Sequence, residues 1–401
     1  MSSIKSGWFS RAIWPHNAML WKAGEWAPPP HGELSERVSV PDHAAPPEHL
    51  DHMTIDPTAS THGTSFRLND RKNKMNPSST GGFDGLGRHN SGYGKRIPSF
   101  YDTPEGHKWV VKSAVDGNTH EPTWTLGGHG KILPNGMRDD SGGGPDRWGA
   151  GYGARCEHAC DKIYNFFATK RNNILPMPTY LYDDHTGTRI EDQPYAPGPA
   201  YRVTPHLGRD ATTGDGVYGT TRDDIQRKGT NGLMVDAFVG AGDLQGSNYM
   251  IKPNPATGEY DGVYRIDNNN ALGRRAKGNE LYEPDRRTGE LGWVPGSWHD
   301  TTSKDFVDNL RYTGILSRLN HGMYEGGKFI DGQHLLDTAK DMVKQYEENP
   351  EEFTSIFDHM PNKEEHLAAA AHRIGLIRKM IEEYHSQPDL LREHIMNGKP
   401  K

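Results

Sequence analysis

The two parts of this 401-residue chain carry different apolar spacing, and that contrast limits the folds it can adopt. Three long segments after residue 300 place apolar residues at the i, i+3, i+4 and i+7 positions of amphipathic helices. They are TSKDFVDNLRYTGILSRLN, DGQHLLDTAKDMVKQYEENPEEFTSIFDHM and KEEHLAAAAHRIGLIRKMIEEYHS. Residues 96–207 instead show short β-prone runs around one helical pattern, RCEHACDKIYNFFATKR, in the order strand, strand, helix, strand, strand. The chain therefore predicts an α+β fold with a β-rich first part and a mainly helical second part.

We predict that residues 1–84 form an extended or disordered arm. They are polar and show no sustained helical or strand period. Because only 33% of the chain is hydrophobic, with 47 Gly and 28 Pro, part of it cannot bury enough apolar surface to pack. The start of the arm holds a tryptophan cluster that would either dock on a partner or pack on the protein's own surface: Trp8, Trp14, Trp21 and Trp26.

Charge and cysteine content exclude several classes of protein. A formal net charge of -7 argues against a broad nucleic-acid-binding face. Cys156 and Cys160 lie four residues apart within one helical pattern, so we expect small buried thiols in a reducing compartment. The chain shows neither an apolar window of the roughly 18 residues needed to cross a membrane nor the apolar core of a signal peptide. We expect a cytoplasmic protein, or one delivered to a host cytoplasm by a route that needs no cleavable signal.

One predicted hairpin gathers candidate metal ligands. Asp243 and Asn248 lie five residues apart in the irregular loop GDLQGSN, and Asp267 ends the second strand of the following hairpin. Each residue taken singly is also common in turns. Together, their oxygens would suit a Mg²⁺ or Mn²⁺ ion carrying nucleotide phosphates, because Mg²⁺ binds through one or two carboxylates plus substrate.

A second group of residues would suit the phosphates themselves. Lys112 ends the apolar run WVVK, where it would neutralise phosphates if a carboxylate held it, and Glu157 on the next helix is the candidate partner. The glycine-rich stretch GGFDGLGRHNSGYGK precedes these strands, and its backbone amides, including those at Gly92 and Gly94, would face phosphate. No G-x-x-x-x-G-K-[ST] motif is present, which excludes the P-loop class.

The ordered set of WVVK, a helix with Glu157, YRVTPHL, GDLQGSN and YRID resembles the protein-kinase-like superfamily. The closest likeness is to its atypical branches, the HipA-like kinases and phosphatidylinositol kinases. The resemblance covers about residues 85–330. It implies a two-lobed kinase-like fold, with a small β-rich lobe over 85–207 and a larger, mainly helical lobe over 208–401.

The resemblance also implies roles for individual residues. Asp243 would orient the attacking hydroxyl or act as base, while Asn248 and Asp267 would bind Mg²⁺ or Mn²⁺. Lys112, with Glu157 as its partner, would hold the phosphates of ATP. The implied activity is transfer of the γ-phosphate to a protein hydroxyl or to a lipid or other small-molecule alcohol.

Three departures from the usual pattern keep alternatives open. No His-Arg precedes Asp243, Asp267 is followed by NNN instead of Phe-Gly, and no Ala-Pro-Glu follows. These absences favour a nucleotide-binding pseudokinase or scaffold, whereas the presence of Lys112, Asp243, Asn248 and Asp267 opposes it. An adenylyl transferase on the same fold is the third alternative.

Overall fold

The computed structural model describes most of the chain after residue 151 and shorter parts before it. The described residues are 30–43, 46–48, 54–55, 98–102, 107–112, 130–132, 138–140, 144–146, 152–183, 187–191, 193, 195, 200–208, 210–241, 244, 246–268, 271–272, 282–284, 291–293, 298–299, 303–316, 327–361 and 363–400.

An antiparallel sheet of five strands forms the β-rich part of the fold, in the order β1-β2-β3-β8-β7. The strands are β1 Thr54–Ile55, β2 Pro98–Asp102, β3 Lys108–Lys112, β7 Tyr180–Asp183 and β8 Ala200–Pro205. β8, the run AYRVTP, is buried along its whole length. Between β3 and β7 in the sequence lies the helix α1, Tyr152–Phe167, so strands that are neighbours in the sheet come from either side of a helix.

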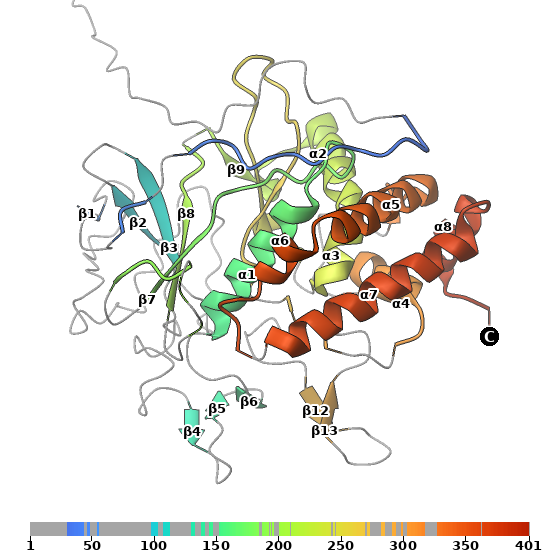
Figure 1. Ribbon diagram of the computed structural model, residues 1–401. Coiled ribbons are helices and arrows are strands. Elements are labelled where there is room, and N and C mark those ends of the chain that lie inside the picture. Colours follow the sequence, from blue (N-terminus) through green and yellow to red (C-terminus); the bar gives the residue numbers. More distant parts are fainter. Residues whose placement is uncertain are drawn as a thin grey trace, which may run out of the picture.

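Helix α1 separates this sheet from the other helices. It packs on β7 and β8 on one side and on α3, Leu233–Val239, and α5, Gly332–Glu348, on the other, as Figure 1 shows. Phe167 on α1 meets Phe238 on α3 edge to face at 5.2 Å, and Phe238 meets Trp298 in the same way at 5.4 Å. Such contacts give the helices a continuous aromatic core.

The remaining elements complete the helical part and three small sheets. The helices are α2 Gly219–Asn231, α4 Phe306–Arg311, α6 Pro350–Ser355, α7 Lys363–Tyr384 and α8 Pro388–Asn397, with a π-helical turn at Tyr312–Leu316 and 3-10 turns at Gly214–Gly216 and Gly246–Asn248. The small sheets contain β9 Thr212–Thr213, β10 Tyr249–Ile251 and β11 Tyr264–Arg265; β4 Gly130–Ile132, β5 Arg138–Asp140 and β6 Gly144–Asp146; and β12 Tyr282–Pro284 with β13 Leu291–Trp293.

The α+β class and the order strand, strand, helix, strand, strand agree with the sequence prediction. The three-stranded sheet β4–β6 is an insertion before α1 that the sequence did not predict. Cys156 and Cys160 are buried free thiols, as expected. Within the described residues, no helix combines the length and the apolar character needed to cross a membrane.

The described part of the arm is extended and docks on the folded core. Figure 1 shows this segment, in blue, passing from the neighbourhood of α5 toward the sheet. Arg37 forms a bidentate pair with Glu352 on α6, and the backbone N–H of Val38 donates to the carbonyl of Ala168 at 2.8 Å. Farther along, His43 meets Trp109 of β3 edge to face at 4.9 Å.

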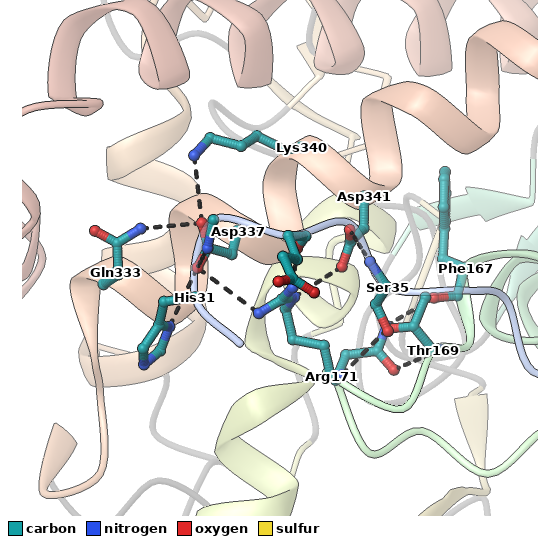
Figure 2. A network of polar contacts seen from close by, with 12 residues as sticks. His31, Ser35, Phe167, Thr169, Arg171, Gln333, Asp337, Lys340 and Asp341 are labelled. Atoms are coloured by element: carbon teal, nitrogen blue, oxygen red, sulfur yellow. Dashed lines mark hydrogen bonds and ion pairs between the residues drawn. The ribbon is translucent and has the colours of Figure 1, made fainter. Parts of the chain in front are cut away.

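A buried arginine connects the arm, the turn after α1 and α5. Arg171 is 1% exposed, and its Nε donates to Asp341 Oδ2 at 2.9 Å while Nη1 lies 3.7 Å from Asp337 Oδ2. The arm also contacts both carboxylates, as Figure 2 shows: the Ser35 N–H donates to Asp341 at 2.8 Å, and His31 Nδ1 lies 3.2 Å from Asp337 Oδ2. Arg171 therefore compensates the charge of both acids on α5, and Lys340 also lies 3.3 Å from Asp337.

His366 on α7 is a second buried polar group. Its Nδ1 accepts a hydrogen bond from Trp298 Nε1 at 3.1 Å, and its ring stacks on Phe357 with centroids 5.4 Å apart. Burial lowers the pKa of the His366 imidazole to about 3. The folded protein therefore holds this histidine neutral at a pH where the unfolded chain would protonate it.

We expect Arg171→Ala to lower the free energy of unfolding by about 3 to 5 kcal/mol, because the buried Asp341 carboxylate loses its arginine partner and Asp337 loses one of two cations. Urea denaturation measures the change. The matched control is Arg378→Ala, which breaks a 2.6 Å ion pair with Glu347 whose side chains are 47% and 52% exposed. That variant should lose less than about 1 kcal/mol. Equal losses of unfolding free energy in the two variants would show that the buried contacts of Arg171 contribute no more than an exposed ion pair.

The depressed pKa of His366 predicts a loss of stability in mild acid. As pH falls below about 6.5, the unfolded chain gains a proton at this position that the folded protein does not take up until about pH 3. Between pH 6.5 and 4 this amounts to about 3 kcal/mol of lost stability. His366→Gln, which keeps an acceptor for Trp298, should flatten the pH dependence measured by urea denaturation across this range. An unchanged slope would show that other groups cause it.

Candidate functional site

The hairpin β10–β11 brings two of the predicted metal ligands to the same end. Tyr249 pairs with Arg265 in the antiparallel register, so Asn248 precedes one strand where Asp267 follows the other. The N–H of Ile266 donates to the carbonyl of Asn248 at 3.1 Å, which fixes the two chain segments beside each other. Asn248 is buried and Asp267 is partly buried. A carboxylate and an amide oxygen therefore stand at one end of this hairpin.

The backbone after the hairpin adopts conformations that L-residues seldom take. Asp267 has φ of 56° and Leu272 has φ of 51°, both in the left-handed region. Asp tolerates this region better than most residues, but for a branched residue such as Leu it is a true outlier. Each costs on the order of 1 to 3 kcal/mol and persists only where surrounding contacts impose it, a situation typical of functional sites.

Those contacts come from α1 and α3. We call residues 266–272, of which 269 and 270 are not described, the Asp267 loop. The Asn268 side chain donates to Asp161 Oδ1 at 2.8 Å, the Cys156 thiol lies 3.4 Å from the carbonyl oxygen of Ala271, and the Leu272 N–H donates to the Val239 carbonyl at 2.9 Å. Two positions on α1 and the end of α3 thus hold the loop.

Asp161 also connects the loop to the five-stranded sheet. Its Oδ2 accepts from Nε of Arg202 on β8, and Nη1 of Arg202 lies 3.5 Å from Glu157 Oε2. Arg202, Glu157 and Asp161 are each less than 5% exposed. Burial opposes the guanidinium charge, but Asp161 and Glu157 outweigh it and raise the pKa of Arg202, with a further contribution from Asp267.

A separate buried pair supports the hairpin from the other side. Arg265 on β11 makes a bidentate pair with Asp236 on α3, with Nε–Oδ1 and Nη2–Oδ2 distances of 2.9 and 2.8 Å. The Tyr164 hydroxyl of α1 donates to the same carboxylate at 2.8 Å. Burial raises the pKa of Tyr164 well above its usual value, so this hydroxyl remains a donor. The hairpin is therefore fixed to both α1 and α3.

The structure describes only some of the other predicted site residues. Asp243, Gly92 and Gly94 lie outside the described residues. Lys112 is described by its backbone: the register of β3 with β8 sets it directly opposite Arg202. Glu157 is on α1, as predicted, and it contacts Arg202. The predicted pair between Lys112 and Glu157 stays a prediction, because the lysine side chain lies outside the described features.

The sequence interpretation missed Arg202, Asp161 and Asn268. Two signals were available: Asp161 follows Glu157 by one helical turn and so shares its face, and a charged arginine stands in the middle of the β-prone run AYRVTP. Nη2 of Arg202 is buried without a hydrogen-bond partner among the described residues. A buried donor of this kind is costly unless a partner satisfies it.

Three carboxylates, on Glu157, Asp161 and Asp267, surround the single guanidinium of Arg202 in the described part of the site. That excess of negative charge, with the Asn248 amide nearby, suits a divalent cation. Within the described residues there is no group of three or more His, Cys, Asp or Glu side chains that would hold a metal by itself. A cation here would need further ligands, such as phosphate oxygens. No protein-family model and no curated protein matches the chain.

Proposed function

We propose that the chain is an ATP-dependent phosphotransferase of the atypical kinase type, which uses Mg²⁺ or Mn²⁺ to transfer the γ-phosphate to an alcohol. The observation that carries the proposal is the end of the β10–β11 hairpin, where Asn248 and Asp267 adjoin through the Ile266–Asn248 hydrogen bond. Mg²⁺ takes few protein ligands and completes its shell with phosphate oxygens and water. Two oxygen-bearing side chains are enough for that role.

The order of elements supports a two-lobed kinase-like arrangement. The chain order β2, β3, α1, β7 and β8 agrees with the order strand, strand, helix, strand, strand predicted for a small β-rich lobe. The hairpin and the helices α2 to α8 follow it in the chain, as expected for a larger, mainly helical lobe. The Asp267 loop contacts α1 through Asn268, so the proposed metal ligand adjoins the junction of the two parts.

The charges near the site support phosphate chemistry. Arg202 offers a buried Nη2 donor with no partner in the described part of the chain. Lys112 lies directly opposite Arg202 in the register of β3 with β8. In the proposed reaction, the acceptor hydroxyl oxygen bonds to the γ-phosphorus while the bond from that phosphorus to the β,γ-bridging oxygen breaks and ADP leaves. Asp243 takes the hydroxyl proton, Asn248 and Asp267 hold the metal, and Lys112 holds the phosphates with Glu157 as its partner.

Incubation with ATP labelled separately at the γ- and α-positions, with Mn²⁺ or Mg²⁺, tests the proposal. We expect transfer of the γ label, and Asp267→Ala should reduce it at least about a hundredfold because charge stabilisation at the phosphates is lost. The matched control is Glu259→Ala, which removes the same charge from the exposed connection at the far end of the hairpin and should leave transfer unchanged.

Other outcomes would replace the proposal with a specific alternative. Transfer of the α label would make the protein an adenylyl transferase. If neither label moves while ATP with Mn²⁺ raises the melting temperature of the wild type and of the Glu259 variant only, the site binds nucleotide without turnover. If neither transfer nor stabilisation is seen, the hairpin is not a nucleotide site.

A further inference from the structure

We infer that Asp161 on α1 is a positioning residue for Asp267 and acts through the side chain of Asn268; this inference rests on the proposed function. Neither Asp161 nor Asn268 is among the residues to which the kinase resemblance gives a role. Both are buried, at 4% and 7% exposure, and the 2.8 Å bond between them links α1 directly to the residue that follows Asp267.

The conformation of Asp267 shows why its neighbour needs to be held. With φ of 56°, Asp267 lies in a region that costs free energy for an L-residue, so without external contacts the chain would relax toward the ordinary extended or helical regions. Such a relaxation would change the direction of the Asp267 side chain. The contact that follows it most closely in the chain is the one from Asn268 to Asp161.

Asp161 is itself fixed by a second partner. Its two carboxylate oxygens accept from different donors: Oδ1 accepts from Asn268, and Oδ2 accepts from Arg202 of β8. A carboxylate held by a buried guanidinium cannot turn freely, because turning would break its hydrogen bond to that arginine. The sheet therefore sets the direction of Asp161, and Asp161 sets the position of Asn268.

Two further described contacts act on the other end of the loop. Cys156 approaches the carbonyl of Ala271, and Val239 accepts from Leu272, both several residues beyond Asp267. On the near side, the Ile266–Asn248 bond fixes only the backbone before Asp267. The Asn268–Asp161 bond lies directly next to Asp267 in the chain, so its loss should change the orientation of Asp267 while the hairpin stays folded.

The test uses the full chain with Asp161→Ala, Asn268→Ala and the double variant. The matched control is Asn165→Ala, one turn farther along α1, which removes two hydrogen bonds to the backbone of Met177, of 2.7 and 2.9 Å, away from the loop. Amide hydrogen exchange of the unliganded proteins measures the peptide that contains residues 266–272. The Mn²⁺ concentration for half-maximal γ-phosphate transfer is measured alongside.

We expect faster exchange over 266–272 in both single variants, and a Mn²⁺ requirement raised about tenfold or more, as is typical when a partner that orients a metal ligand is lost. The double variant should be no worse than the more severe single one, since both changes remove the same link. Asn165→Ala should lose stability without a change in either measurement.

Each alternative result has a definite meaning. Unchanged exchange in both single variants overturns the inference whatever the activity of the wild type. Faster exchange with an unchanged Mn²⁺ requirement overturns it too, because the contact would then serve folding alone. A wild type that shows neither phosphate transfer nor Mn²⁺-dependent stabilisation by ATP removes the proposed function, and with it the inference. A metal-dependent wild type with unresponsive variants removes only the inference.

Discussion

The buried contact between Arg202 on β8 and the carboxylates of α1 determines how the two parts of this fold meet. A guanidinium that is 3% exposed requires charged partners, and Glu157 and Asp161 supply them from successive turns of the same helical face. This requirement fixes both the rotation of α1 about its axis and its position along β8. Apolar packing alone would tolerate small changes in both, because hydrophobic contacts have little directional preference.

The same arrangement recurs at two other places. Arg171 joins the turn after α1 to two acids on α5, and Arg265 joins the hairpin to Asp236 on α3. Each pair connects segments far apart in sequence. Pairs of this kind contribute little net stability compared with apolar residues of equal volume, but breaking one is costly. In a chain with 33% hydrophobic residues, we interpret them as ties that select one arrangement of the elements.

Much of the framework could be predicted from periodicity, and the errors have physical causes. The order of strands around α1 was predictable because β-branched and aromatic runs alternate with one clear helical pattern. Helix α2 was missed because GTTRDDIQRKGTN contains three Thr or Gly residues at its start and buries only a few side chains, so its apolar signal is weak. One predicted helical segment is split into α5 and α6 because Pro350 begins a new helix after Asn349.

The candidate site was predictable only where residues are close in sequence. Asn248 and Asp267 are joined by a hairpin, whose register follows from local pairing, so their proximity could be inferred. The link from Asn268 to Asp161 spans 107 residues and that from Arg202 to Asp161 spans 41. No periodic pattern encodes which buried acid meets which buried donor, because that depends on how α1 packs on the sheet. Arg202 could be identified as unusual in its strand, but its partners could not.

Helix α1 also explains why the described part of the arm belongs to the folded unit. At its end, the Ala168 carbonyl receives Val38, and Arg37 lies 4.8 Å over the ring of Phe166. Arg171, just beyond, shares its two acids with the arm. A close-packed interior does not deform continuously, so α1 cannot shift toward or away from α5 without breaking these contacts. Because the inner face of the same helix holds Asn268, the arm and the Asp267 loop take their positions from a single rigid element.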